Sequence, residues 1–146
     1  MSGIFVGVDG SSHSGAALDW ALREAGIRHE PLTVITVQVV PTSGWGGSVQ
    51  YPADQASRAN AQKAVQDTVD KAAAQLGDAA PRSITVQAVL GQPAAQLIEA
   101  TKDADLLVVG SRGTGGFTRL LLGSVSTQVS EHAHCPVVIV PSDRRP

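Results

Sequence analysis

The chain contains little of what several common classes of protein require. Its single cysteine, Cys135, excludes an internal disulfide and suits a reducing compartment such as the cytoplasm. With three lysines and a net charge of -2, it offers no electrostatic basis for binding nucleic acid or an anionic membrane. No apolar run approaches the roughly 20 residues that span a bilayer, and the N-terminus lacks the basic and apolar regions of a signal peptide. We therefore expect a cytoplasmic protein with neither nucleic-acid nor membrane partners.

The length and the composition fit one globular domain. At 146 residues the chain is long enough for a layered core but short for two domains. A hydrophobic content of 42% and a charged content of 16% are typical of globular proteins. We therefore treat residues 1–146 as a single domain.

Five short runs rich in Val, Ile and Leu predict β-strands. Several of them are almost entirely apolar, which is typical of parallel strands buried on both faces. The runs are Ile4–Val8, Leu32–Val40, Ile84–Leu90, Leu106–Val109 and Val137–Val140.

Between these runs, apolar residues recur at helical spacing. Helices are predicted around Leu18–Ala25, from about Ala53 to Leu76, around Ala94–Thr101 and from Ser124 onward. Glycines and a proline are placed to end or begin these helices; they are Gly26, Gly77, Gly91 and Pro93. Strands and helices alternate along the chain, and this order predicts a parallel sheet covered by helices on both faces.

A glycine-rich segment links the fourth predicted strand to the last predicted helix. Gly110, Gly113 and Gly123 have the spacing Gly-x2-Gly-x9-Gly, and Ser124 follows as a good helix N-cap. Amides in such a loop and at a helix N-terminus attract anions, and glycine lets a ligand approach the backbone. We expect amides just beyond the strand to stay unpaired until a polyanion completes them. From these residues alone, a turn followed by a simple helix cap is an equally good interpretation.

With its flanks, the glycine-rich segment resembles the ATP-binding branch of the universal stress proteins. The motif of that branch is Gly-x2-Gly-x9-Gly-Ser/Thr, and the four positions just named match it residue for residue. The stretches Ile4–Ser11, Ala104–Gly110 and Cys135–Val140 also agree with the family. The resemblance extends over essentially the whole chain.

The resemblance implies a fold as well as a motif. The expected fold is a five-stranded parallel sheet of order 3-2-1-4-5, of the Rossmann-like or flavodoxin-like nucleotide-binding kind. Connections in such a sheet reverse direction between the first and fourth strands, and ligands bind outside the carboxyl ends of the strands at that point. Asp9 follows the first predicted strand and the glycine-rich segment follows the fourth, so both clues indicate the same edge.

The resemblance further implies that ATP binds at this edge, with Mg²⁺ or Mn²⁺ held through its phosphates. Arg112 lies between the first two glycines, and its planar guanidinium donates hydrogen bonds in pairs, which suits a phosphate. A solvated surface arginine is the alternative interpretation. The residues expected around the ribose and phosphates are Gly110, Arg112, Gly113, Gly123, Ser124, Val125 and Ser126.

The remaining expected contacts involve the base and the sugar. Asp9 would accept hydrogen bonds from ribose hydroxyls or base N–H groups, although a carboxylate there also helps to cap the first helix. Gly7 would leave room beside the base. Val39 and Val40, at the end of the second predicted strand, resemble the family position whose backbone meets the adenine edge, and the sequence leaves open which of the two does so.

Two further segments carry potential chemistry. Residues 41–52 have loop composition and leave the same edge of the sheet, so both interpretations, a lid over the site and a simple connector, stay open.

His132, His134 and Cys135 could ligate zinc or copper. A closed zinc site needs four ligands, and the sequence contains no second cluster, so we assign no metal held by protein side chains.

The resemblance thus implies a stress-response regulatory protein that binds ATP with little or no hydrolysis. We do not expect an enzyme, because neither a lysine clamp nor a water-activating base accompanies the glycines. The alternatives are a sensor of AMP or cyclic AMP, and a substrate-adenylating enzyme of related fold. The turn from Asp9 to Ser14 lacks the pyrophosphate signature that such an enzyme needs. A homodimer is also expected, since the last strand, Val137–Val140, would be an exposed edge suited to pairing.

Overall fold

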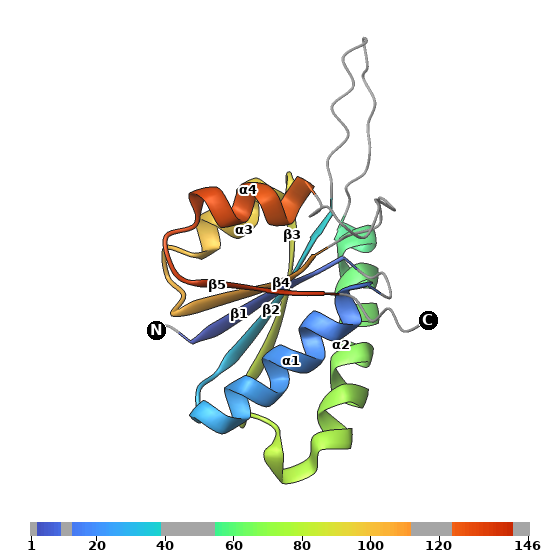
Figure 1. Cartoon of the computed structure of the whole chain (residues 1–146). Helices are drawn as coiled ribbons and strands as arrows, with labels where there is room; N and C mark the ends of the chain where they lie inside the picture. Colours follow the sequence, from blue (N-terminus) through green and yellow to red (C-terminus); the bar gives the residue numbers. More distant parts are fainter. Residues whose placement is uncertain (1–2, 10–12, 39–54, 112–123, 142–146) are drawn as a thin grey trace, which may run out of the picture.

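The computed structural model describes residues 3–9, 13–38, 55–111 and 124–141 (Figure 1). Strands and helices alternate in these ranges as the sequence predicts. The elements are β1 (Ile4–Val8), α1 (His13–Arg28), β2 (Leu32–Gln38), α2 (Gln55–Leu76), the 3-10 turn η1 (Gly77–Ala79), β3 (Ile84–Leu90), α3 (Pro93–Ala100), β4 (Leu106–Gly110), α4 (Ser124–His132) and β5 (Val137–Val140). The predicted bounds of β1, β3 and β5 are confirmed, and β4 is one residue longer than predicted.

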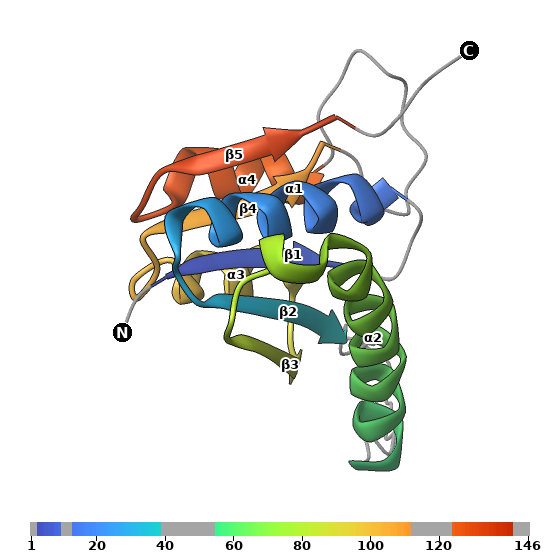
Figure 2. The ribbon, with the colours of Figure 1, turned by 90° about the horizontal axis from the view of Figure 1, so that it is seen from below.

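The strands form one parallel sheet of order β3-β2-β1-β4-β5, as predicted. Figure 2 shows the five strands side by side in this order. Helices α1 and α2 lie on one face of the sheet, and α3 and α4 lie on the other (Figure 1). The strand order places β1 and β4, which are far apart in sequence, next to each other at the centre.

Alternate side chains of each strand supply two separate cores. In β4, Leu106 and Val108 pack with the helices of one face, whereas Leu107 and Val109 pack with those of the other. Side chains of a strand point alternately to opposite faces, so a strand covered on both faces must be apolar throughout. This explains why the central strands read as continuous apolar runs.

Gly26 lies inside α1 and does not end it, so the prediction that it stops the helix is wrong. The helix continues to Arg28 and ends where His29 takes a left-handed conformation, with φ of 57°. The Glu30 amide then bonds the Ala25 carbonyl at 3.0 Å. A Cβ atom at Gly26 would overlap the carbonyl oxygen of Ala79, so the glycine permits close approach of the η1 turn.

The predictions that Gly77, Gly91 and Pro93 lie at helix ends or turns are confirmed. Gly77 follows α2 with φ of +55°, and Gly91 has φ of +142° in the turn between β3 and α3. Both values lie in the region that favours glycine. Pro93 lies in the first turn of α3, where its missing N–H costs no helical hydrogen bond. None of the helices in the described ranges combines the length and the apolar character of a membrane-spanning segment.

Candidate functional site

The hydrogen-bonded ladder between β1 and β4 ends before the strands do. It runs from the pair Ile4 and Leu106 to the pair Val6 and Val108, although both strands continue for two more residues. On its other side, β1 remains paired with β2 as far as Val8. The two central strands therefore part at their carboxyl ends. This is the point of a doubly wound sheet where connections reverse direction and ligands bind.

Asp9 and Gly7 lie at this end of β1, and the structure gives them different surroundings. Asp9 is the first residue beyond the strand and is exposed. Gly7 is within the strand, and a Cβ there would lie 2.9 Å from Cδ1 of Leu97, which is buried in α3. The contact with Leu97 explains why a glycine occupies this position. The expected place of Gly7 beside a base stays a prediction.

Ser111, directly beyond β4, has both of its backbone polar groups bonded. Its N–H donates to the Val140 carbonyl at 2.9 Å, and its carbonyl accepts a hydrogen bond from Oγ of Ser126 at 3.2 Å. We expected amides just beyond the fourth strand to be unpaired. This is wrong for Ser111, because its amide already donates to a carbonyl of β5. Sequence reasoning did not single out Ser111, and its position beside the first motif glycine is the one signal that could have done so.

The three predicted residues of the first turn of α4 point in different directions. Ser124 is exposed and Val125 is half-buried, whereas Ser126 is only 2% exposed. The Ser126 hydroxyl donates inward to the Ser111 carbonyl, so it joins the start of α4 to the end of β4. Of the two serines in this turn, Ser124 is the exposed one.

Of the other predicted site residues, one lies at the end of β4 and the rest lie outside the described ranges. Gly110 is the last residue of β4 and pairs with Val140. The remaining predicted residues lie outside the described part of the chain, as does the segment 41–52; they are Val39, Val40, Arg112, Gly113 and Gly123.

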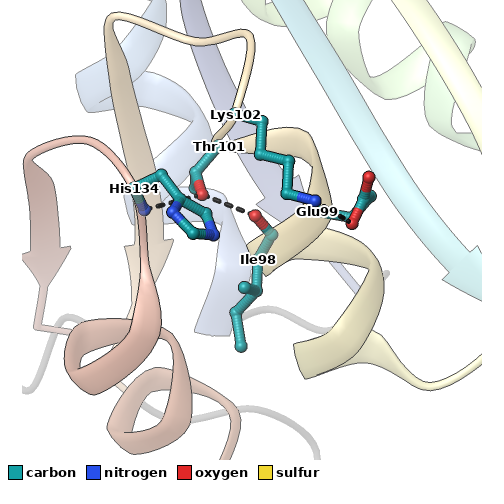
Figure 3. Close-up of polar contacts among 5 residues, drawn as sticks. All are labelled: Ile98, Glu99, Thr101, Lys102 and His134. Atoms are coloured by element: carbon teal, nitrogen blue, oxygen red, sulfur yellow. Dashed lines mark hydrogen bonds and ion pairs between the residues drawn. The ribbon is translucent and has the colours of Figure 1, made fainter.

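His134, in the turn before β5, has a structural role through its backbone. The backbone N–H of His134 donates to Oγ1 of Thr101 at 2.9 Å, and the Thr101 hydroxyl donates to the Ile98 carbonyl at 2.5 Å (Figure 3). Thr101 is 1% exposed, so this pair of bonds ties the end of α3 to the turn before β5. Across the ranges that the structure describes, no three His, Cys, Asp or Glu side chains gather to hold a metal ion.

Cys135 is also poorly suited to act as a nucleophile. Burial raises the pKa of its thiol above the ordinary value, a hydrogen bond with the Leu107 backbone opposes this, and the Asp105 carboxylate adds to the rise. A catalytic thiol needs the opposite shift. Burial is the largest cause of the shift in the Cys135 pKa.

Comparison with known proteins decides the family. The model of the universal stress protein family matches residues 1–141 of the chain. The chain belongs to the universal stress protein family. A universal stress protein of Mycolicibacterium smegmatis is 38% identical over 144 residues, which cover 97% of this chain and 48% of that protein. One of Mycobacterium tuberculosis is 34% identical over 143 residues, with the same two coverages. The chain thus spans about half the length of these curated relatives.

Solved structures of universal stress proteins share the fold. The UspA protein from Lactobacillus plantarum is 25% identical, with a TM-score of 0.76, and the match covers 95% of this chain and 97% of that one. A universal stress protein in complex with cAMP is 27% identical, with a TM-score of 0.69 and coverages of 97% and 98%. These matches confirm the predicted fold class.

Proposed function

We propose that this universal stress protein binds an adenine nucleotide at the carboxyl ends of β1 and β4, and that ATP is its principal ligand. The observation that carries the proposal is the early end of the β1–β4 ladder at the point where the strand connections reverse. Asp9, directly after β1, is exposed, and so is Ser124, the first residue of α4. An anion bound beside α4 would gain from the positive end of the helix dipole.

A divalent cation would be held through the nucleotide, and not by protein ligands alone. Mg²⁺ in proteins commonly keeps several waters and binds substrate phosphates with one or two carboxylates. When bound, the cation would neutralise phosphate charge. The residues that would hold the nucleotide are Asp9, the motif glycines and Ser124. The glycine-rich segment contains no lysine, so efficient phosphoryl transfer is not expected, and slow or absent hydrolysis is part of the proposal.

A sensor of cyclic AMP is the second candidate function. Its support is the solved universal stress protein in complex with cAMP, which is 27% identical to this chain. Cyclic AMP carries one phosphate, whereas the Gly-x2-Gly-x9-Gly-Ser segment offers anion-binding amides over a longer stretch of chain. This length favours a triphosphate.

Calorimetric titration with ATP, AMP and cyclic AMP under the same conditions tests the proposal. We expect ATP with Mg²⁺ to bind more tightly than AMP, and phosphate release to stay at ~0.01 s⁻¹ or below, against about 10 s⁻¹ for a typical enzyme. Tighter binding of cyclic AMP than of ATP would favour the second candidate. No heat and no binding with any of the three at millimolar concentration would overturn nucleotide binding altogether.

We also propose that the chain forms a homodimer through β5. The two edge strands of the sheet differ: Nε2 of Gln62 in α2 donates to the Val86 carbonyl of β3 at 2.9 Å, and so occupies part of that edge. No described side chain makes a comparable bond to β5, whose four apolar residues are all half-buried. An unprotected apolar edge strand is a template for pairing.

A single proline substitution in β5 tests whether the dimer forms through this edge strand. The Pro136 carbonyl accepts from Leu107 of β4 and the Val140 carbonyl accepts from Ser111, directly beyond β4. Alternation along the strand therefore places the Ile139 N–H on the outer side. Light scattering is expected to give a dimer for the parent at micromolar concentration and a monomer for Ile139→Pro, with circular dichroism confirming that the variant is folded. A monomeric parent, or a variant that dimerises as well as the parent, would contradict pairing through β5.

A further inference from the structure

We propose that Ser126 is a positioning residue that holds the start of α4 against the end of β4 and thereby prepares the nucleotide site. The inference rests on the function proposed above. It assigns Ser126 a different role from the one predicted for it, because its hydroxyl acts on the protein backbone and not on a phosphate.

The first step is the chemical environment of the hydroxyl. Ser126 lies on the inward face of α4 with Val129, and the two side chains are 2% and 0% exposed. A hydroxyl buried without a hydrogen bond destabilises the folded state. Here Oγ donates to the carbonyl of Ser111 at 3.2 Å, across 15 positions of sequence. The bond to Ser111 therefore explains why a serine occupies this buried position. An apolar residue could fill the same space but could not make the bond.

The second step is the place of the acceptor. Ser111 follows the first motif glycine and is the last residue described before Ser124, and its N–H is already held by the Val140 carbonyl at 2.9 Å. The backbone of Ser111 is thus held by β5 through its N–H and by α4 through its carbonyl. Twelve residues, 112–123, separate Ser111 from the first residue of α4. The Ser126 bond holds the two ends of this segment together.

The third step links this bond to nucleotide affinity. A ligand that binds between β4 and α4 needs both elements in one relative position. If the position is set before binding, the ligand does not have to order the elements, and its affinity is higher. Loss of one neutral hydrogen bond then predicts a fall in ATP affinity of about 3- to 10-fold for Ser126→Ala.

The same helix provides a matched control. The Ser130 hydroxyl donates to the Thr127 carbonyl at 2.9 Å, within α4 and on its exposed side. Ser130→Ala therefore removes the same group without releasing α4 from β4. Ser126→Thr keeps the hydroxyl and is expected to restore binding. If Ser126→Ala does not fold, Ser126→Cys, a weaker donor of similar size, takes its place in every measurement.

Two measurements on the full chain test the proposal: calorimetry with ATP and Mg²⁺, and amide hydrogen exchange of the nucleotide-free protein. For Ser126→Ala we expect weaker binding together with faster exchange in the first turn of α4, whereas Ser126→Thr and Ser130→Ala behave as the parent. Parental affinity of Ser126→Ala would overturn the proposal. Weaker binding with unchanged exchange would also overturn it, because that result indicates direct contact with the nucleotide.

The design separates this inference from the function on which it rests. If the parent binds no adenine nucleotide, the proposed function fails and the positioning role fails with it. If the parent binds ATP and Ser126→Ala binds it equally well, only the positioning role fails.

Discussion

Replacing Gly26 with alanine is expected to lower the free energy of unfolding by about 1–3 kcal/mol, although alanine is the better helix former. An added Cβ would overlap the carbonyl oxygen of Ala79 and lie 3.0 Å from the carbonyl carbon. Both atoms belong to the backbone of the η1 turn, so no side-chain rotation can relieve the contact. Urea denaturation followed by circular dichroism measures the change.

Gly15 provides the matched control for this prediction, because it lies in the same helix and is exposed. A Cβ at Gly15 meets no described atom within 4 Å. Gly15→Ala is therefore expected to raise stability by up to ~1 kcal/mol, the difference in helix propensity. If Gly26→Ala also raised stability, the close approach between α1 and η1 would not be as tight as the structure has it.

Replacing Gly113 with valine is expected to weaken ATP binding at least ~100-fold. The second motif glycine lies outside the described residues, so the argument comes from its place in the Gly-x2-Gly-x9-Gly-Ser segment. A branched side chain there would keep a phosphate away from the backbone amides and would not tolerate the conformations open to glycine. Calorimetry with ATP and Mg²⁺ provides the affinity.

Ala74→Val is the control for the added side-chain volume. Ala74 is exposed near the end of α2, and this variant should bind ATP as the parent does. A folded Gly113→Val variant with parental affinity would show that phosphates do not approach the chain at this glycine, and would place the site elsewhere.

The elements and their order could be predicted because the signals for them are local. Apolar runs bounded by turn residues predicted each strand, and the alternation of strands and helices predicted a parallel sheet. Gly26 shows where such reasoning fails. A glycine near the end of an apolar helical pattern usually marks a stop, but here its partner is Ala79, which the fold brings to the helix from far along the chain.

The same limit applies to the candidate site. Ser124 and Ser126 carry the same functional group two residues apart, and their sequence context predicts a phosphate contact for both. The structure gives them different surroundings, because Ser124 is exposed, whereas Ser126 is buried and its hydroxyl bonds the Ser111 carbonyl; the phosphate contacts themselves stay predictions. Gly7 likewise reads as space for a base, although its missing side chain already makes room for Leu97. Tertiary contacts of this kind leave no trace in local sequence.

A crystal structure of the protein saturated with ATP and Mg²⁺ tests the central claim most directly. The account predicts the nucleotide at the carboxyl ends of β1 and β4, with Asp9 beside its sugar or base and its phosphates next to the first turn of α4. A nucleotide bound at any other surface, or an empty site in crystals soaked well above the measured Kd, would contradict it.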